Sequence, residues 1–349
     1  MTALLKGFWY VALPGRGLGR GRMVAKSLLG EPVVVGRRED GGVFALRNIC
    51  PHRGIPLHHG WLEGGDVVCC YHGWRFGTEH GRCTAIPSLT DDQDIHLDRI
   101  GVTSYPCREH QGNVWVYLPE DSPGVPDAGV LPEIPTMPGV GGWAPQVSLA
   151  MDFACDVDHA VVGLMDPTHL GYVHTSWWWQ KRNREPRVKE KHYVPFGTGF
   201  RLERHELKQG GRLYRLLGRH VTTEITFQLP GIRVEHIQGD RHSVVALTAI
   251  TPLTEHTTEV HQFVYWTMSW MRPFRPVAQR LARTFLGQDR DVVVRQEAGL
   301  AYDPPLILID DADTQAKWYY RLKQQYLKSQ RDGTAFDNPL RPQILRYRS

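Results

Sequence analysis

The sequence predicts an α+β protein of two parts, an all-β first part followed by a part that joins an antiparallel sheet to helices. Up to about residue 120, short strand-like runs alternate with Gly, Pro and Asp turns, and helical spacing of apolar residues begins only after Pro273. The 349 residues suffice for two domains, each with its own core. We therefore expect a first domain over 1–120, a linker over 121–142 and a second domain over 143–349.

Four runs in the first part have strand-like length and are rich in β-branched or aromatic residues. They read EPVVVGRR, GVFALRNI, GDVVCCYHG and GNVWVYLP. This composition and length favour β-strands, so we expect the first domain to be all-β. The stretch from Pro119 to Gly142 is so rich in Pro and Gly that we expect no regular element in it, which is why the linker is placed there.

The second part begins with a strand-like run over 143–150. Three further runs, RHVTTEITFQLPG, RHSVVALTAITPL and TTEVHQFVYWTMSW, show the partial alternation of an antiparallel sheet. Beyond Pro273, apolar residues recur every three or four positions and predict a long helix. A shorter helix is expected over 313–329, followed by a tail with Pro and Arg that we interpret as an arm.

Composition excludes several functional classes. The net charge of +4 is only mildly basic, which does not indicate nucleic-acid binding, and no run approaches eighteen apolar residues, so no membrane span is expected. Six cysteines are too few for a secreted disulfide framework. We expect reduced thiols and a cytoplasmic protein. The basic run GRGLGRGR over 15–22 is interpreted either as a solvated loop or as a docking patch for an acidic redox partner.

The most informative stretch runs from Cys50 to His72. It contains C-x-H, then sixteen residues, then C-x-x-H, which offers two thiolates and two imidazoles on two short loops. Such a set holds a [2Fe-2S] cluster in which one iron takes both cysteines and the other both histidines, as in a Rieske centre. The prediction assigns Cys50 and Cys69 to one iron, and His52 and His72 to the other.

A structural zinc site is the alternative for the same four residues, since two Cys and two His can hold zinc tetrahedrally. The alternation of Cys and His in both halves and the turns at Gly54 and Gly73 favour the cluster, because Gly tolerates the positive φ of turns that direct N–H groups toward sulfide. We expect neighbouring Cys70 to be a buried small residue rather than a ligand.

The stretch DPTHLGYVH over 166–174 is the second candidate site. Three helical residues correspond to about −60°, so Asp166 and His169 would share a helix face, whereas five residues correspond to about 140°. His169 and His174 can therefore meet one ion only if the helix widens or breaks, and Gly171 is the expected position. Two His and one carboxylate would leave positions open for dioxygen and substrate at a non-haem iron. The alternative is two ordinary hydrogen-bonded histidines.

Together these motifs resemble the Rieske non-haem iron oxygenases, the oxygenase (alpha) subunits that hydroxylate rings or demethylate aromatic compounds. The first stretch resembles their Rieske domain, and GLMDPTHLGYVH resembles their D-x-x-H-x4-H element. The resemblance implies a START-like helix-grip catalytic domain in which His169 and His174 bind a mononuclear iron. It also implies that Asp166 lies between the two metal centres. Several demethylating members carry Asn where this chain has Gly163.

The carboxylate ligand is expected from the helical segment LGQDRDVVVRQEAGL. Its resemblance to the family segment implies Asp289 as the ligand. Asp291 is the competing residue, because it faces a different side of the same helix and only one of the two can point inward. Glu297 and Asp303 are expected to be surface charges.

The resemblance implies a terminal oxygenase that takes electrons from an NAD(P)H-dependent reductase or a ferredoxin, activates O2, and hydroxylates or O-demethylates a small aromatic substrate. It further implies a homotrimer in which one subunit's cluster serves the next subunit's iron. The alternatives are a cis-dihydroxylating dioxygenase, a Rieske electron carrier with a non-catalytic binding domain, and a zinc-stabilised binding protein. The residues that could contact a flat ring, or simply form core, are the aromatic Trp177, Trp178, Trp179, Phe263, Tyr265 and Trp266, together with Met268.

Overall fold

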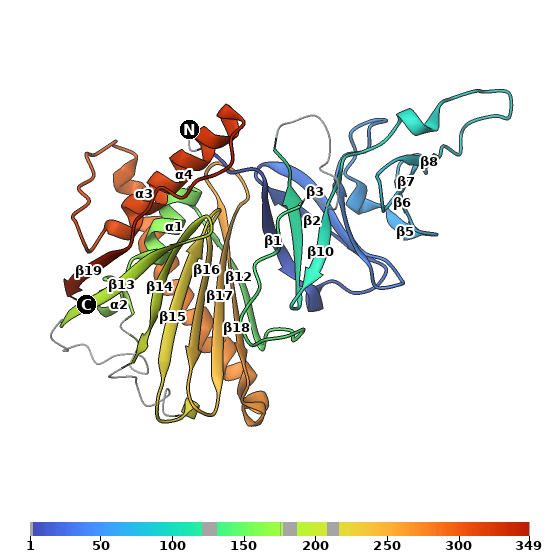
Figure 1. Ribbon diagram of the computed structural model, residues 1–349. Coiled ribbons are helices and arrows are strands. Elements are labelled where there is room, and N and C mark those ends of the chain that lie inside the picture. Colours follow the sequence, from blue (N-terminus) through green and yellow to red (C-terminus); the bar gives the residue numbers. More distant parts are fainter. Residues whose placement is uncertain (1–2, 121–130, 175, 177–186, 208–215, 349) are drawn as a thin grey trace. The chain divides into compact units, whose positions relative to one another are not determined.

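The computed structural model describes residues 3–120, 131–174, 176, 187–207 and 216–348. By internal contacts the chain forms two compact units, coloured blue to cyan and green to red in Figure 1. One unit contains Lys6–Thr136 with Pro252–Thr254, and the other contains Met137–Thr251 and Glu255–Ser349 with Met1–Leu5. The expected α+β class, with an all-β unit before a unit of sheet and helices, is confirmed. None of the described helices is both long and apolar enough to cross a membrane.

Three antiparallel sheets build the all-β unit, in the orders β1-β11-β10, β2-β3-β4-β9 and β5-β6-β7-β8. Each of the four runs predicted as strands contains one: β3, β4, β6 and β11. The bounds are β1 (Phe8–Pro14), β2 (Arg22–Leu28), β3 (Glu31–Arg37), β4 (Val43–Arg47), β5 (Trp61–Glu63), β6 (Asp66–Val68), β7 (Arg75–Gly77), β8 (Cys83–Ala85), β9 (Ser104–Tyr105), β10 (Cys107–His110) and β11 (Asn113–Leu118).

The sheet of three-residue strands serves mainly to position a loop. Strand β6 ends at Val68 and β7 begins at Arg75, so residues 69–74 form the connection between two paired strands. Beneath this loop, the buried side chains of Val34, Leu46 and Phe76 form one apolar cluster that also includes Cys50 and Cys69. Both cysteines that the sequence predicted as ligands are therefore fixed by the core of this unit.

An eight-stranded antiparallel sheet dominates the second unit, in the order β12-β18-β17-β16-β15-β14-β13-β19. Figure 1 shows these strands as one continuous, twisted sheet with helix α3 running behind it. The strands are β12 (Val147–Phe153), β13 (Val188–Phe196), β14 (Gly199–Glu206), β15 (Thr222–Gln228), β16 (Ile232–Gln238), β17 (Ser243–Pro252), β18 (Thr258–Trp266) and β19 (Gln343–Arg348). The helices are α1 (Val157–Met165), α2 (Leu170–Val173), α3 (Arg275–Leu300) and α4 (Thr314–Asp332).

Helix α4 packs on one face of this sheet through aromatic side chains. The ring of Trp318 lies 5.1 Å from that of Phe200 and 5.5 Å from that of Tyr193, and Tyr319 lies 6.0 Å from Phe227. Helix α3 is fixed to edge strand β12 by Gln279, whose amide bonds to the backbone of Ser148. Such large aromatic contacts dominate core energetics, so this face is the interior of the unit.

Four strands of the second unit were not anticipated, and their sequences explain why. At the start of β13, charged side chains follow one another instead of alternating with apolar ones. The residues of β19 were interpreted as part of an arm. Instead β19 pairs with β13 at the sheet edge, from Val188↔Arg348 to Tyr193↔Gln343. Strands β14 and β16 were also not predicted from the sequence. Of the predicted linker, residues 131–142 contain no helix or strand, and 121–130 lie outside the described residues.

Candidate functional site

The two loops predicted to hold the cluster have the same hydrogen-bonded frame. In each, the backbone N–H of a Gly four residues after the Cys donates to that Cys carbonyl, at 2.9 Å for Gly54 and Cys50 and 3.0 Å for Gly73 and Cys69. Both glycines have positive φ, +74° and +68°. These are the conformations that only Gly adopts without strain, so C-x-H and C-x-x-H fold into equivalent turns despite their different spacing.

The four predicted ligands converge between these loops. Cys50 and Cys69 are 2% and 1% exposed, and the rings of His52 and His72 lie 4.4 Å apart. Trp74 stacks on His52 at 4.6 Å and thereby fixes the ring plane. Among the described residues, nothing hydrogen-bonds the buried Nδ1 of His52. A pair of buried, neighbouring thiols and a pair of neighbouring imidazoles, one with an orphaned nitrogen, fit the ligand set of a Rieske cluster.

Other groups near these loops have ordinary roles. Burial, followed by the neighbouring Cys69 thiol, raises the pKa of Cys50 to about 11, as expected for a thiol held in the core. The prediction that Cys70 is buried is wrong, because its position in the turn directs it to solvent. His58 exchanges hydrogen bonds with Asn48 at 2.8–2.9 Å.

The second cluster lies between α2 and α3 and contains His169, His174 and Asp289. Asp289 Oδ1 is 3.4 Å from His169 Nε2 and 3.2 Å from His174 Nε2, and the two Nε2 atoms are 3.3 Å apart. His174 is wholly buried and the Asp289 side chain is 7% exposed. Two imidazoles and one carboxylate that converge on one point form the donor set that non-haem iron enzymes use, so the residues fit such an ion.

The chain brings both histidines together by breaking the helix twice, at positions that differ from the expected one. Helix α1 ends at Met165, and Asp166 caps the turn by accepting hydrogen bonds from the N–H and hydroxyl of Thr168, both 2.7 Å. His169 then begins the short helix α2, which ends before His174. Asp166 and His169 thus flank a turn rather than sharing a helix face, and the expected break at Gly171 is wrong.

Helix α3 places the two candidate carboxylates on different sides. Its buried residues Leu286, Asp289 and Val293 recur at helical spacing and define the inward face. Asp291 lies on the outer side, half exposed, and pairs with Arg290 at 2.8 Å. Glu297 is not a free surface charge as expected, because its carboxylate lies 2.7 Å from His159 Nδ1.

Neighbours of His174 were missed by sequence reasoning. Its ring stacks on Phe285 at 3.5 Å, and its Nδ1 lies 3.3 Å from Gln288 Oε1. The Gln288 amide in turn donates to Ser176. Their spacing on α3, one turn before and one residue before Asp289, is the signal that could have identified them. A partner on Nδ1 orients the imidazole so that Nε2 faces the carboxylate.

Electrostatics in this cluster are dominated by contacts between carboxylates and imidazoles. Burial alone would lower the pKa of His169, but Asp166 and Asp289 raise it to about 9. Burial alone would raise the pKa of Asp289, yet its contacts with His169 and His174 hold it below its usual range. Asp166 Oδ2 lies 3.7 Å from His169 Nδ1. The carboxylates are therefore anionic and each faces the same histidine.

A cavity of about 250 Å³ opens beside this cluster. Its walls include Asp166, His169 and Asp289, with Gln315 from the start of α4. On α1, Gly163 lies so close to α3 that an added Cβ would be 2.7 Å from Val293 Cγ2. The chain thus has no room at Gly163 for the Asn that several demethylating oxygenases carry, and packing between α1 and α3 explains the Gly. Of the residues predicted either to contact a flat ring or to form core, Phe263, Tyr265, Trp266 and Met268 are buried core, and Trp177–Trp179 lie outside the described residues.

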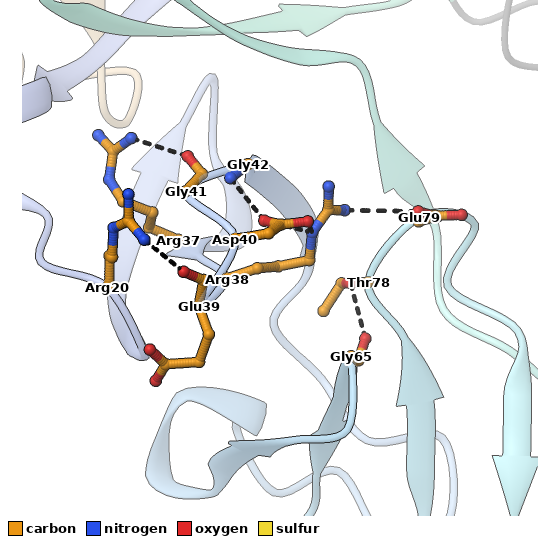
Figure 2. A network of polar contacts seen from close by, with 10 residues as sticks. All are labelled: Arg20, Arg37, Arg38, Glu39, Asp40, Gly41, Gly42, Gly65, Thr78 and Glu79. Carbon is orange, nitrogen blue, oxygen red and sulfur yellow. Dashed lines mark hydrogen bonds and ion pairs between the residues drawn. The ribbon is translucent and has the colours of Figure 1, made fainter.

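The basic run over 15–22 is partly engaged within its own unit. Figure 2 shows the guanidinium of Arg20 reaching the Glu39 carbonyl, at 2.8 Å. In the same network Arg37 donates to the Gly41 carbonyl and Arg38 approaches Asp40 and Glu79. These bonds stabilise the turn between β3 and β4, so part of the run's charge has a structural role.

Comparisons with known proteins match both parts of the chain. The family described as Rieske [2Fe-2S] domain matches residues 8–106, and the vanillate O-demethylase oxygenase C-terminal domain matches residues 154–325. The chain is 36% identical over 178 residues to the oxygenase subunit of 3-chlorobenzoate-3,4-dioxygenase from Comamonas testosteroni. The aligned residues cover 50% of this chain and 39% of that protein. It is 32% identical over 173 residues to the oxygenase component of dicamba O-demethylase from Stenotrophomonas maltophilia, 48% and 47% of the two chains.

A third relative is chlorophyllide a oxygenase of Arabidopsis thaliana, 32% identical over 172 residues, 49% of this chain and 30% of that one. The chain thus spans less than half the length of these curated relatives. Among solved structures, dicamba monooxygenase bound to dicamba superposes with a TM-score of 0.72 at 22% identity, over 94% of this chain and 100% of that one. A caffeine-bound NdmA mutant of Pseudomonas putida superposes with a TM-score of 0.75 at 21% identity, over 98% of this chain and 97% of that one. At such identities the likeness establishes the fold alone.

Proposed function

This chain belongs to the Rieske non-haem iron oxygenases, and from that premise we propose that it is the terminal oxygenase component of a Rieske oxygenase system. The proposed reaction inserts one oxygen atom of O2 into a C–H bond of a small aromatic substrate, while two electrons and two protons convert the other atom to water. On an aryl methyl ether, the hydroxylated methyl group would leave as formaldehyde. O-demethylation is the proposed reaction type.

The meeting of His169, His174 and Asp289 is the observation that carries this proposal. Two imidazoles and one carboxylate gathered at one point, with a cavity beside them, would leave coordination positions of an iron free for other ligands. We propose these three residues as the ligands of a mononuclear Fe(II). When bound, that iron would supply the site at which dioxygen is activated. If His174 and Asp289 had only a structural role, nothing would require this wholly buried histidine to face a buried carboxylate beside a cavity.

We propose Cys50, His52, Cys69 and His72 as the ligands of a [2Fe-2S] cluster that would supply electrons singly. Two thiolates on one iron and two imidazoles on the other give the mixed ligand set that raises the potential of such clusters. The chain's own part is to hold these side chains in fixed turns.

Asp166 is the proposed positioning residue between the two centres. Its carboxylate is held by two hydrogen bonds from Thr168 and faces His169 Nδ1, so it can fix the orientation of that imidazole. We further propose that its other side faces His72 of the next subunit in a homotrimer. The domains are proposed to be 1–120 and 143–349, joined by a linker over 121–142.

Partners follow from this chemistry. The electrons must come from an NAD(P)H-dependent reductase, a ferredoxin or both, and O2 is the second substrate. Since such reductases draw on the cytoplasmic nicotinamide pool, we propose a cytoplasmic location.

The decisive experiment compares Asp289→Ala with Asp291→Ala. The first should lose the mononuclear iron, and iron per chain should fall from about three to about two while labile sulfide and the visible spectrum of the cluster remain, because only one ligand set is changed. Asp291→Ala is the matched control, two residues away on the same helix, and should retain all iron. Loss of iron in the control but not in Asp289→Ala would move the ligand to Asp291. One zinc per colourless chain would refute the oxygenase proposal.

Ring dihydroxylation is the second candidate, because one relative is named a dioxygenase. Turnover with a reductase and a methoxylated aromatic acid distinguishes the two reactions. Formaldehyde supports demethylation, and a cis-dihydrodiol supports dihydroxylation. Oxidation of NADH with electron transfer through the cluster to an added acceptor, but without either product, would instead favour the electron-carrier alternative.

A further inference from the structure

Strand β13 presents lysines to the interior of the second unit. Along it, Val188, Glu190 and His192 are exposed, whereas Lys189 and Lys191 are half-buried and Tyr193 follows them, fully buried. Since side chains alternate between the faces of a strand, both lysines share the face of Tyr193. Inward lysines are rare unless they are paired.

The face that carries these lysines is also the face that leads to the proposed iron site. Tyr193 packs against Trp318 of α4 at 5.5 Å, and its hydroxyl accepts a hydrogen bond of 2.9 Å from Gln315. Gln315 in turn lines the cavity that contains His169 and Asp289. Tyr193, two residues along β13 from Lys191 and on the same face, is thus connected through Gln315 to the cavity wall.

Lys191 has a hydrogen-bond acceptor but no counter-ion. Its ammonium contacts Nε2 of His205, and His205 Nδ1 lies 3.0 Å from the Glu203 carbonyl, so His205 donates through Nδ1 and accepts from the lysine. The carboxylate on this face, Glu235, is paired with Arg233 at 3.1 Å. Within the part of the chain that the structure describes, no carboxylate lies within ion-pair distance of Lys191. Burial and the charge of Lys189 lower its pKa to about 8, which still leaves it cationic at neutral pH.

We infer that Lys191, supported by His205, binds the anionic group of the substrate, a carboxylate or sulfonate attached to the aromatic ring. This inference rests on the proposed function and names the substrate class of that site. A half-buried ammonium with an acceptor on one side and no anion on the other gains most from a ligand that supplies the anion. Lys189 adds a second positive charge on the same strand face, while the uncharged end of the ligand would extend toward Tyr193, Gln315 and the cavity.

Equilibrium binding to the resting holoenzyme, without reductase, tests this inference. The probes are 3-methoxybenzoate, its neutral isostere 3-methoxybenzamide, and benzenesulfonate, each titrated calorimetrically up to about 1 mM, the upper range of ordinary substrate affinities. The wild-type protein should prefer the acid to the amide by about tenfold or more, as a charge-assisted hydrogen bond gives. Lys191→Met should lower the ratio of acid affinity to amide affinity to about one, and Lys191→Arg should retain most of the preference for the acid.

The matched control is Lys328→Met, which removes an exposed lysine from α4 and should leave the preference unchanged. If Lys191→Met does not fold, as judged by the visible spectrum of the cluster, Lys191→Gln replaces it. Benzenesulfonate distinguishes a general anion site from a carboxylate site. A wild-type protein that binds no acidic probe, or a Lys191 variant that keeps the preference, would overturn the inference.

The pH dependence gives a second readout. Acid affinity should fall as pH rises above about 8, because the free protein loses the Lys191 proton there, and binding near that pH should take up a proton. Of the titratable groups around Lys191, Lys189 acts on its charge and His205 accepts its hydrogen bond, whereas Glu235 acts on His205 and is paired with Arg233. Burial lowers the pKa of His205, so this imidazole is neutral above pH 8. Lys191→Arg should remove the fall.

Failure of the oxygenase proposal would appear as absent NADH-dependent turnover with the binding preference intact, whereas turnover of neutral aromatics without acid preference would refute only the anion site.

Discussion

A buried ion pair between α1 and α4 permits a quantitative test of how the second unit is held together. Asp158 Oδ1 accepts hydrogen bonds from Lys323 Nζ at 2.5 Å and from the hydroxyl of Tyr319 at 2.6 Å. The Lys323 and Asp158 side chains are 7% and 15% exposed. Because α1 leads directly into the turn of Asp166 and His169, this pair fixes the helix that positions the second centre.

Asp158→Asn keeps the shape of the side chain and removes its charge, so the Lys323 ammonium stays buried without a counter-ion. Breaking a buried pair in this way costs about 3–5 kcal/mol. For a unit of roughly 150–250 residues each kcal/mol lowers Tm by about 2–4 °C, so the transition of this unit should move down by about 6–20 °C. The second change Lys323→Met should restore much of the loss, since it removes the uncompensated charge.

Differential scanning calorimetry of the holoprotein measures this shift, and the chain offers a matched control. Lys317 on the same helix pairs with Asp310 at a similar distance, 2.6 Å, but the Asp310 side chain is 92% exposed. Asp310→Asn should cost about 0–1 kcal/mol, the usual range for a surface pair. Equal shifts for Asp158→Asn and Asp310→Asn would refute the reasoning, because the Asp158 pair is buried and also receives the Tyr319 hydrogen bond, whereas the Asp310 carboxylate is exposed.

Two further predictions concern the second centre. Gly163→Ala should destabilise the protein by about 1–3 kcal/mol, measured by the same calorimetry, because its Cβ would be 2.7 Å from Val293 Cγ2; adding Val293→Ala should recover part of the loss. Gly171→Ala, where a Cβ meets nothing within 4 Å, should show no such loss. Asp166→Asn should retain iron and sulfide but turn over poorly, since an amide replaces the orienting carboxylate. The His72→Ala and His169→Ala chains should each be inactive alone, and verified mixed oligomers of the two should recover part of the activity. If the mixed oligomers recover no activity, electron transfer between subunits is contradicted.

Local spacing explains why the sequence was informative about the first centre. Cys50, His52, Cys69 and His72 lie in two short turns, and a turn is closed by hydrogen bonds between residues four apart, so ligand types and glycines are visible in one stretch. The α+β division and the long helix after Pro273 were likewise predictable, because apolar periodicity is a local property of the chain.

Only the tertiary structure decided what depends on residues far apart in the sequence. Asp289 and Asp291 lie two positions apart, about 200° around a helix, and nothing local determines which faces inward. Packing of α3 places Asp289 against His169 and His174 and leaves Asp291 with Arg290. Strand β13 was missed because its inner face carries lysines where core strands carry apolar residues. Its pairing with β14 and β19 turns Lys191 inward, and such pairing depends on contacts between distant segments rather than on local sequence.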